Sequence, residues 1–360
     1  MPYKISGTKS ETARIIILKE SDWSIESNTV ISGSGAYEVG DLETGNKSVI
    51  SRTNDGEVLG YGAVSAEEYV PATGDRGVFG GGEGTTNVID YVTISTTGDA
   101  TDFGDLTVSR ERFGATSNGV TGRGVFAGGY TAYPARTTTM DYIAILTLGD
   151  ATDFGDLLTA RAFLDGCSNR TNNRGVFGGG ITADYSDVLE YITISTTGNA
   201  QDFGDLSDTK YGKAACSNGE TDRGLFAGGL TGYSDVIDHI TISTNSNATN
   251  FGDLYMARAH LAATSNGTND RGVFGGGGTP TATNLIDYVT ISTTGNATIF
   301  GELTVARSLF SACSNYTSNR GLFVGDINII DYVTITSTGD AIDFGDLTVA
   351  RYGVSACSNG

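Results

Sequence analysis

An Arg-Gly-(Val/Leu)-Phe motif recurs through most of the chain and constrains the fold more than any other feature. Its six copies begin at Arg76, Arg123, Arg174, Arg223, Arg271 and Arg320. Consecutive copies are 47 to 51 residues apart. A repeat of this length is typical of architectures in which each repeat is one supersecondary unit that buries its apolar face against its neighbours.

Each repeat contains four short segments with the pattern of β-strands. In the first repeat these are an apolar run at 76–82, an alternating run at 88–95, a short run at 100–106 and a run at 113–118. A Thr-Thr-Gly-Asp turn separates the second from the third, and its Gly supplies a positive φ. Helical periodicity is absent from the region. Four strands in about 50 residues predict one propeller blade, so we expect six blades.

The repeat resembles the kelch family, whose architecture is also that of the central domain of galactose oxidase. The resemblance rests on a Gly-Gly pair that ends the first strand (Gly81-Gly82 in the first copy) and on an acidic-Tyr pair on the next. It also rests on a basic residue after the third strand, namely Arg110, Arg161, Lys210, Arg258, Arg307 and Arg351. Phe103 and its equivalents take the place of the usual kelch Trp. The resemblance implies a fold, and a fold alone does not imply a function.

The ends of the repeat region predict how the propeller closes. In kelch order, strands a to d run from the centre outwards, and strand a carries the Cys-Ser-Asn or Thr-Ser-Asn sequence. The region begins with a strand b at Arg76 and ends with a lone strand a at 352–359. We therefore expect the C-terminal strand to complete the first blade, which leaves no unpaired edge at the junction.

Residues 1–70 lack the repeat. Alternating runs at 13–18, 35–39 and 47–51 predict a small β-sandwich. The segment 33–45 resembles the hairpin of carboxypeptidase-regulatory-like, transthyretin-like domains, which are common adaptors in surface and virion proteins. With 66–71 as linker, we predict an all-β chain in which residues 1–70 form an anchor domain and residues 71–360 a six-bladed propeller.

Length varies at one place in the repeat. Each acidic-Tyr pair lies 33 residues before the next Arg-Gly, whereas the distance from Arg-Gly to the acidic residue ranges from 11 to 18. All insertions therefore fall in the b–c connection, and variable surface loops often carry function. We expect the b–c and d–a connections on one face and the N-terminal domain on the other. The candidate binding residues are Tyr130, Tyr133, Arg136, Asp184, Tyr185, Tyr233 and Asp235.

Charge restricts the partners. The chain has 42 acidic and 22 basic residues, a net charge of −20, which argues against a nucleic-acid partner. No apolar run approaches the roughly 18 to 20 residues of a spanning helix, so we expect no membrane insertion. The first residues lack the apolar core of a secretory signal, so we expect synthesis in the host cytoplasm without export by that route. Two basic positions recur in every blade, twelve residues in all, which predicts structural ion pairs between blades with the repeated Asp.

The sequence offers few residues that could catalyse a reaction or bind a metal ion. His239 occupies the Tyr position of its repeat and His260 precedes a strand a, so we interpret both as scaffold or surface residues. Asp99, Asp102 and Asp105 have a spacing that suits Ca²⁺, but other repeats interrupt the pattern. We expect no catalytic residue, metal or cofactor. The cysteines share their position with Thr in other repeats, which predicts small buried positions and four free thiols: Cys167, Cys216, Cys313 and Cys357.

Near-identical repeats and this pairing of domains resemble bacteriophage virion components. The resemblance implies a non-enzymatic tail-fibre or capsid-surface protein that attaches to a host-surface glycan or protein through its b–c loops. Residues 1–70 would bind other virion structural proteins, and a homo-oligomer is compatible with the sequence. Two alternatives stay open. One is a decoration or cement protein that binds no receptor, and the other is an enzyme acting on polysaccharide.

Overall fold

The structure is a computed structural model that describes residues 75–358 apart from 85, 120–121, 169–172, 219–220, 266–269 and 316–318. It also describes the backbone of six strands before residue 65. The chain divides into two compact units, Met1–Pro71 and Ala72–Gly360. The predicted linker at 66–71 lies outside the described residues.

The first unit contains two antiparallel sheets. One is four-stranded with the order β3-β2-β5-β6, and the other pairs β1 with β4. The strands are β1 (Tyr3–Lys9), β2 (Ala13–Lys19), β3 (Ile25–Ile31), β4 (Gly35–Leu42), β5 (Lys47–Arg52) and β6 (Val58–Val64). All three alternating runs of the sequence are strands. Their assembly into a sandwich stays a prediction.

The second unit is a six-bladed β-propeller, as the repeat predicts. Each blade is a four-stranded antiparallel sheet with strands in the order a, b, c, d. The a strands are β10 (Gly114–Asn118), β16 (Asp165–Ser168), β20 (Ala214–Ser217), β24 (Ala262–Ser265), β28 (Ser311–Ser314) and β32 (Ser355–Ser358). The b strands are β7 (Arg76–Gly80), β11 (Arg123–Ala127), β17 (Arg174–Gly178), β21 (Arg223–Ala227), β25 (Arg271–Gly275) and β29 (Arg320–Val324).

The outer strands complete each blade. The c strands are β8 (Val88–Thr93), β14 (Thr139–Ala144), β18 (Val188–Thr193), β22 (Val236–Thr241), β26 (Leu285–Thr290) and β30 (Ile329–Thr334). The d strands are β9 (Thr101–Asp105), β15 (Thr152–Asp156), β19 (Gln201–Asp205), β23 (Thr249–Asp253), β27 (Thr298–Glu302) and β31 (Ile342–Asp346). Two short strands, β12 (Tyr130–Ala132) and β13 (Ala135–Arg136), form a hairpin in the b–c loop of the second blade. No helix occurs among the described residues, and hence none that could span a membrane.

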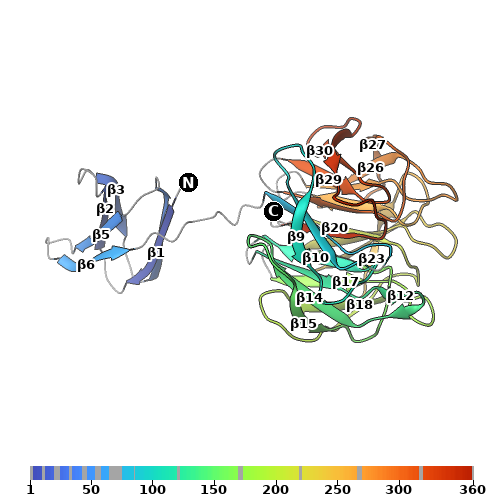
Figure 1. The fold of residues 1–360 in the computed structure, drawn as a ribbon, viewed down its shortest axis with the longest axis horizontal. Coiled ribbons are helices and arrows are strands. Elements are labelled where there is room, and N and C mark those ends of the chain that lie inside the picture. The colour runs from blue at the N-terminus through green and yellow to red at the C-terminus, as the bar shows by residue number, and fades with distance from the viewer. Residues whose placement is uncertain are drawn as a thin grey trace. The chain divides into compact units, whose positions relative to one another are not determined.

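The C-terminal strand closes the ring. β32 pairs antiparallel with β7, so that Ser355 lies opposite Gly80 and Ser358 opposite Gly77. The first blade thus takes strand a from one end of the repeat region and strands b, c and d from the other. Figure 1 shows the orange-to-red strands of the sixth blade returning beside the cyan β9 of the first. The predicted closure is confirmed.

The core lies between blades. Each apolar cluster joins the side chains of two neighbouring sheets, as Val78 and Ile89 of the first blade join Phe126 and Ile143 of the second. Strand b is buried on both faces, which explains its continuous apolar sequence. The strand c pattern, with a buried apolar residue beside a half-buried Tyr, repeats in every blade. At the Tyr position of the fourth blade lies His239, as predicted.

The glycine of Arg-Gly is required by contact between blades. A Cβ at Gly124 would lie 2.5 Å from Sγ of Cys357 in the preceding blade, and one at Gly224 would lie 2.6 Å from Sγ of Cys167. Where strand a carries Thr instead, its methyl group makes the same approach, as Thr116 does to Gly175. The cysteines are therefore small packing residues. All four are free and buried, as expected, and burial raises the pKa of each thiol.

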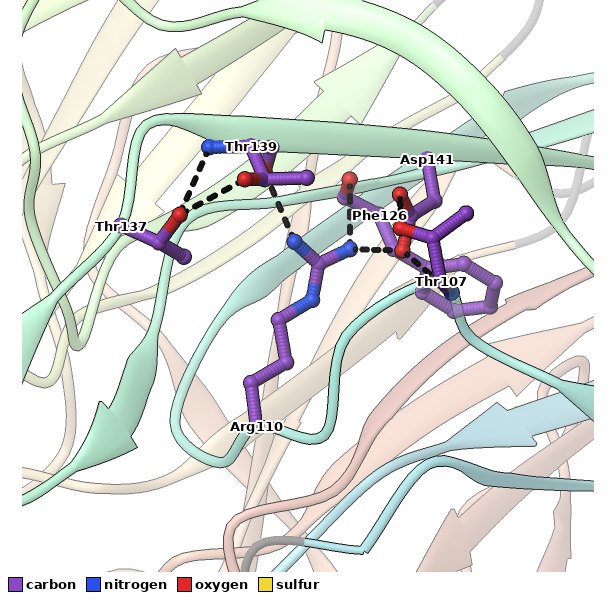
Figure 2. Close-up of polar contacts among 6 residues, drawn as sticks. All are labelled: Thr107, Arg110, Phe126, Thr137, Thr139 and Asp141. Carbon is purple, nitrogen blue, oxygen red and sulfur yellow. Dashed lines mark hydrogen bonds and ion pairs between the residues drawn. The ribbon is translucent and has the colours of Figure 1, made fainter.

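Buried ion pairs join neighbouring blades. Arg110, after strand d of the first blade, donates to Asp141 on strand c of the second at 2.8 Å, and neither side chain is exposed. The same guanidinium donates to the carbonyl oxygens of Thr139 and Phe126 (Figure 2). Equivalent pairs are Arg161–Glu190, Arg258–Asp287, Arg307–Asp331 and Arg351–Asp90. For these arginines the predicted ion pairs between blades are present, and the acidic partner is the acidic residue of the acidic-Tyr pair.

The fourth blade departs from this rule. Lys210 holds the position of the conserved arginine but pairs with Asp208 at 2.5 Å. Lys213, which the repeat leaves without a role, lies 2.9 Å from Asp208 and 3.8 Å from the buried Asp238. An ammonium group lacks the planar fork with which arginine bonds carboxylate and carbonyls together. Two lysines and an extra aspartate therefore replace one arginine.

The six arginines of the Arg-Gly motif also connect neighbouring blades, at the opposite face of the propeller. Arg76 of strand b donates to the carbonyl oxygen of Ile145 in the next blade and stacks over Tyr91 of its own blade, 4.6 Å from the ring centroid. The corresponding arginines of the other blades donate to the equivalent isoleucine carbonyl oxygens. All twelve repeated basic positions thus serve the scaffold, and candidate functional residues have to be sought elsewhere.

Candidate functional site

The b–c loops and the d–a segments share one face of the propeller, as the strand order predicts. Backbone bridges join them in four blades, for example between Glu111 of a d–a segment and Tyr130 of a b–c loop. The same pairing joins Ala162 to Ile181 and Tyr211 to Leu230. We call this the loop face. The bridges anchor the variable loops to the segments that lead into the central strands.

The hairpin of the second blade carries three of the predicted site residues. The ring of Tyr130 is 2% exposed and lies 5.3 Å from the ring of Tyr133, which is 75% exposed. The guanidinium of Arg136 lies 5.4 Å from the centroid of Tyr130. Tyr130 is therefore an anchor within the protein, and Tyr133 is the side chain that the hairpin presents to solvent.

The loops of the third and fourth blades carry the other four. Tyr185 is 49% exposed and stacks on Tyr211 with centroids 5.4 Å apart and planes 7° from parallel. Asp184 is exposed, and its backbone N–H donates to Oγ1 of Thr182. Tyr233 is 39% exposed, and Asp235 of the same loop is exposed. Burial, followed by the neighbouring Tyr185, raises the pKa of Tyr211.

Three further rings connect these loops, and the sequence analysis proposed none of them as a binding residue. Phe163, Tyr211 and His260 contact one another with centroid distances of 5.1 to 5.6 Å. Phe163 also contacts Tyr130, at 6.0 Å. Rings from the second to the fifth blade thereby form one packed group, which we call the aromatic rim: Tyr130, Tyr133, Phe163, Tyr185, Tyr211 and His260.

The signal for the missed rings was present in the sequence. Phe163 and His260 stand two residues after the basic residue that follows strand d, where the six repeats carry six residues of varied chemistry. Those residues are Arg112, Phe163, Gly212, His260, Leu309 and Gly353. A position with constant spacing has a fixed backbone place in every blade. Because its side chain nevertheless varies in size and charge, that side chain is not required for packing between blades.

These six residues form a closed ring around the propeller axis. All have φ between 55° and 68°, in the left-handed region. The backbone N–H of each donates to the carbonyl oxygen of its counterpart in the preceding blade, from Arg112 to Gly353 and onwards around the circle. Gly212 has a second reason to be glycine, because a Cβ there would lie 2.4 Å from Nδ1 of His260.

The ring frames the mouth of the central channel. A cavity of about 60 Å³ lies within it, lined by Arg112, Phe163, His260 and, deeper, Asp165. The guanidinium of Arg112 lies 5.0 Å from the Phe163 centroid. Burial, followed by the charge of Arg112, lowers the pKa of His260 to about 4, so this ring is neutral at pH 7. The sequence analysis interpreted His260 as a scaffold or surface residue, and the structure places it in the aromatic rim, beside the cavity.

Asp165 places a buried carboxyl group inside the channel. Its carboxylate accepts hydrogen bonds from the backbone N–H groups of Gly166 and Ala215, both at 2.8 Å. Desolvation raises its pKa to about 7 despite these bonds. Below it, six serines line a wider cavity of about 130 Å³, and the hydroxyl of each donates to the backbone carbonyl of the serine in the preceding blade.

The repeated aspartates that suggested Ca²⁺ serve the backbone. Oδ1 of Asp99 accepts the N–H of Asp346 in the neighbouring blade at 3.1 Å. Asp150 accepts from Asp105 in the same way, and Asn199 takes this role where Asp is replaced. Within residues 75–358, short gaps aside, no three His, Cys, Asp or Glu side chains gather in an arrangement that could hold a metal ion.

The loop face therefore combines exposed tyrosines, a packed support beneath them and carboxylates and hydroxyls between them. Tyrosine offers a flat apolar surface with a polar edge, which suits stacking against sugar rings and protein surfaces. Neither known protein families nor curated proteins match the chain. The function of this six-bladed β-propeller has to be argued from the geometry of its loop face.

Proposed function

We propose that the chain is a non-enzymatic structural protein of a bacteriophage virion that displays its propeller and attaches to a host-surface glycan through the loop face. The observation that carries the glycan part is the exposure of Tyr133, Tyr185 and Tyr233 on the loop face. They come from the loops of three consecutive blades and keep between 39% and 75% of their surface exposed. A folding requirement would bury such rings, as it buries Tyr130.

The support beneath the rings favours binding as well. Tyr185 stacks on Tyr211, and Tyr133 contacts Tyr130 edge-on, so a second ring holds each of these two exposed rings in place. A ring fixed before binding loses little conformational entropy when a ligand stacks on it. The repeated basic residues are occupied between blades, which leaves an acidic surface that favours an uncharged ligand.

The virion assignment rests on the resemblance of the repeats and of the domain pairing. In this proposal residues 1–70 bind other virion structural proteins, and the propeller carries the contact with the host. A decoration protein that binds no receptor is the competing function, and the two differ in what the exposed tyrosines do.

The test compares tyrosine variants of the full chain. Tyr133→Ala and Tyr233→Ala should each weaken binding to host cells or purified surface glycan by about 1–3 kcal/mol, on the scale of aromatic stacking. Thermal stability should stay within about 0.5 kcal/mol, as is usual for surface changes. Leu148→Ala is the matched control, because Leu148 is 52% exposed in the c–d turn of the second blade, away from the loop face.

Variants that bind cells like the parent would refute the attachment role and leave the decoration protein as the better account. Loss of binding in Leu148→Ala to the same extent would also count against it, since the effect would then not belong to the loop face.

A further inference from the structure

A hollow opens on the loop face between the second and third blades. Its volume is about 260 Å³. The d–a segment after β15 forms one side and the b–c loop of the third blade forms the other. The side chains used below are Thr159, Arg161, Thr182, Tyr185, Ser186 and Asp187. Pockets for drug-sized ligands measure about 300–1,000 Å³, so this hollow suits one small polar ring.

The floor of the hollow is an imperfect version of the tie in Figure 2. There, Arg110 uses both terminal nitrogens in hydrogen bonds. In the hollow, Arg161 donates from Nη1 to the carbonyl oxygen of Val188 at 2.8 Å. Its Nη2 lies 3.2 Å from Oε1 of Glu190, and neither atom makes a hydrogen bond among the described residues.

The longer acid explains the difference. The other arginine ties use Asp, and the third blade alone uses Glu at this position. Glu190 directs Oε2 to the backbone N–H of Leu158, and Oε1 is left poorly aligned with the guanidinium. Arg161 is 1% exposed, so the floor presents a buried polar pair whose hydrogen-bonding capacity is not used up.

The lip adds an unpaired carboxylate. Asp187 makes no side-chain hydrogen bond or ion pair among residues 75–358 as described. The residues at its position in the second and fifth blades, Thr138 and Asn284, bond instead to the acidic residue that ends strand d. In the third blade that residue is Asp205, which a second carboxylate cannot bond. Asp187 is thus left available to a ligand.

Tyr185 links the hollow to the aromatic rim, because its ring stacks on Tyr211 and also lines the hollow. A ligand in the hollow would meet an aromatic wall, two threonine hydroxyls and a carboxylate. These are the groups that recognise a sugar ring: C–H bonds pack on the aromatic wall, and a carboxylate accepts hydrogen bonds from two adjacent hydroxyls.

Charge decides between sugar classes. Arg161 and Glu190 neutralise one another, which leaves Asp187 as the net charge of the hollow, in a chain of net charge −20. A uronic or sialic acid would bring a second negative charge to it. We propose that this hollow is a subsite for one uncharged hexose unit with adjacent free hydroxyls. The inference rests on the proposed glycan attachment and names its ligand class.

The test measures the binding of monosaccharides to the full chain by ligand-observed NMR. The probes are the methyl glycosides of glucose, galactose and mannose, with glucuronic acid as the charged counterpart. We expect at least one neutral hexose to bind and glucuronic acid to bind at least tenfold more weakly. Asp187→Ala should weaken hexose binding at least tenfold. Thr159→Val should weaken it as well, because Thr159 belongs to the d–a segment on the other side of the hollow.

Two variants serve as matched controls. Asp343→Ala removes an exposed carboxylate on β31 of the sixth blade, outside the hollow, and Leu148→Ala removes an exposed apolar side chain in the c–d turn of the second blade. Both should bind the monosaccharide like the parent. Unchanged melting temperatures exclude a folding defect in each variant.

The outcomes separate this inference from the proposed function. If Asp187→Ala binds hexose like the parent, or if glucuronic acid binds better than every neutral hexose, the subsite is refuted. Should Tyr133→Ala still abolish cell binding in that case, the attachment role stands without the subsite. A parent that binds neither hexose nor cells refutes both.

Discussion

Removal of the closing strand tests the architecture most directly. A chain ending at residue 350 lacks β32 and the Arg351 that precedes it. The first blade then has three strands, and β7 presents an unpaired edge towards the channel. Every other blade keeps its four strands, so the change probes closure alone.

The magnitude follows from what the segment contributes. Burying a side chain the size of Val354 stabilises by about 1.5–3 kcal/mol, and Ala356 and Cys357 add smaller amounts. Loss of Arg351 leaves the buried Asp90 without its cation, which costs about 3–5 kcal/mol. The total of about 5–8 kcal/mol approaches the whole stability of an ordinary domain, about 5–15 kcal/mol. We therefore expect the truncated propeller to lose cooperative unfolding and to aggregate through the open edge.

The assay is thermal unfolding followed by near-ultraviolet circular dichroism, with size-exclusion chromatography for aggregation. A control variant moves residues 351–360 to a position just before Asp75, where Ser358 already lies opposite Gly77. This transplant restores the first blade by a hairpin like those of the other blades and should recover the parental melting temperature. A truncated chain that melts cooperatively at the parental temperature would refute the closure argument.

Three further outcomes are expected. Gly124→Ala should destabilise by about 1–3 kcal/mol through its clash with Cys357, and Cys357→Ala should relieve most of that loss, so additive effects in a denaturant-unfolding double-mutant cycle would contradict the contact. All four thiols should resist an aromatic disulfide reagent in the native protein and react on denaturation, because burial raises the pKa of each; fast native reaction would contradict it. The pKa of Asp165 is about 7 in the fold and about 3.9 in an unfolded chain, so the folded state holds its proton longer and stability should fall as pH rises from about 4 to 7; Asp165→Asn should flatten this slope in urea unfolding, and an unchanged slope would count against the buried carboxyl.

The repeat predicted the scaffold well because the same packing and pairing requirements recur in all six blades. The glycine of Arg-Gly, the acidic-Tyr pair and the basic residue each meet one residue of a neighbouring blade, so their spacing carries the architecture. His239 could be assigned from its position alone. The Arg258–Asp287 tie could be expected as an ion pair, although its geometry could not.

The aromatic rim was only half predictable. Loop length pointed to Tyr130, Tyr133 and Tyr185, because insertions lie where the scaffold does not constrain the chain. Phe163 and His260 come instead from segments of constant length, and they meet because a left-handed turn brings them to the axis. That convergence depends on the curvature of the whole ring, which no single repeat contains.

The two hydrogen-bonded circles, one of left-handed backbone groups and one of serine hydroxyls, have a consequence for how the molecule can come apart. In both circles every donor points to the preceding blade, so the bond dipoles follow one another head to tail and each polarises the next. An open row of such hydrogen bonds ends in an unused donor and an unused acceptor, whereas a closed circle has neither. If one blade loosens, each circle opens and leaves one donor and one acceptor unpaired. This happens at two levels of the channel, because there are two circles. The circles therefore penalise any partial opening, because a blade that moves away breaks bonds in both of them.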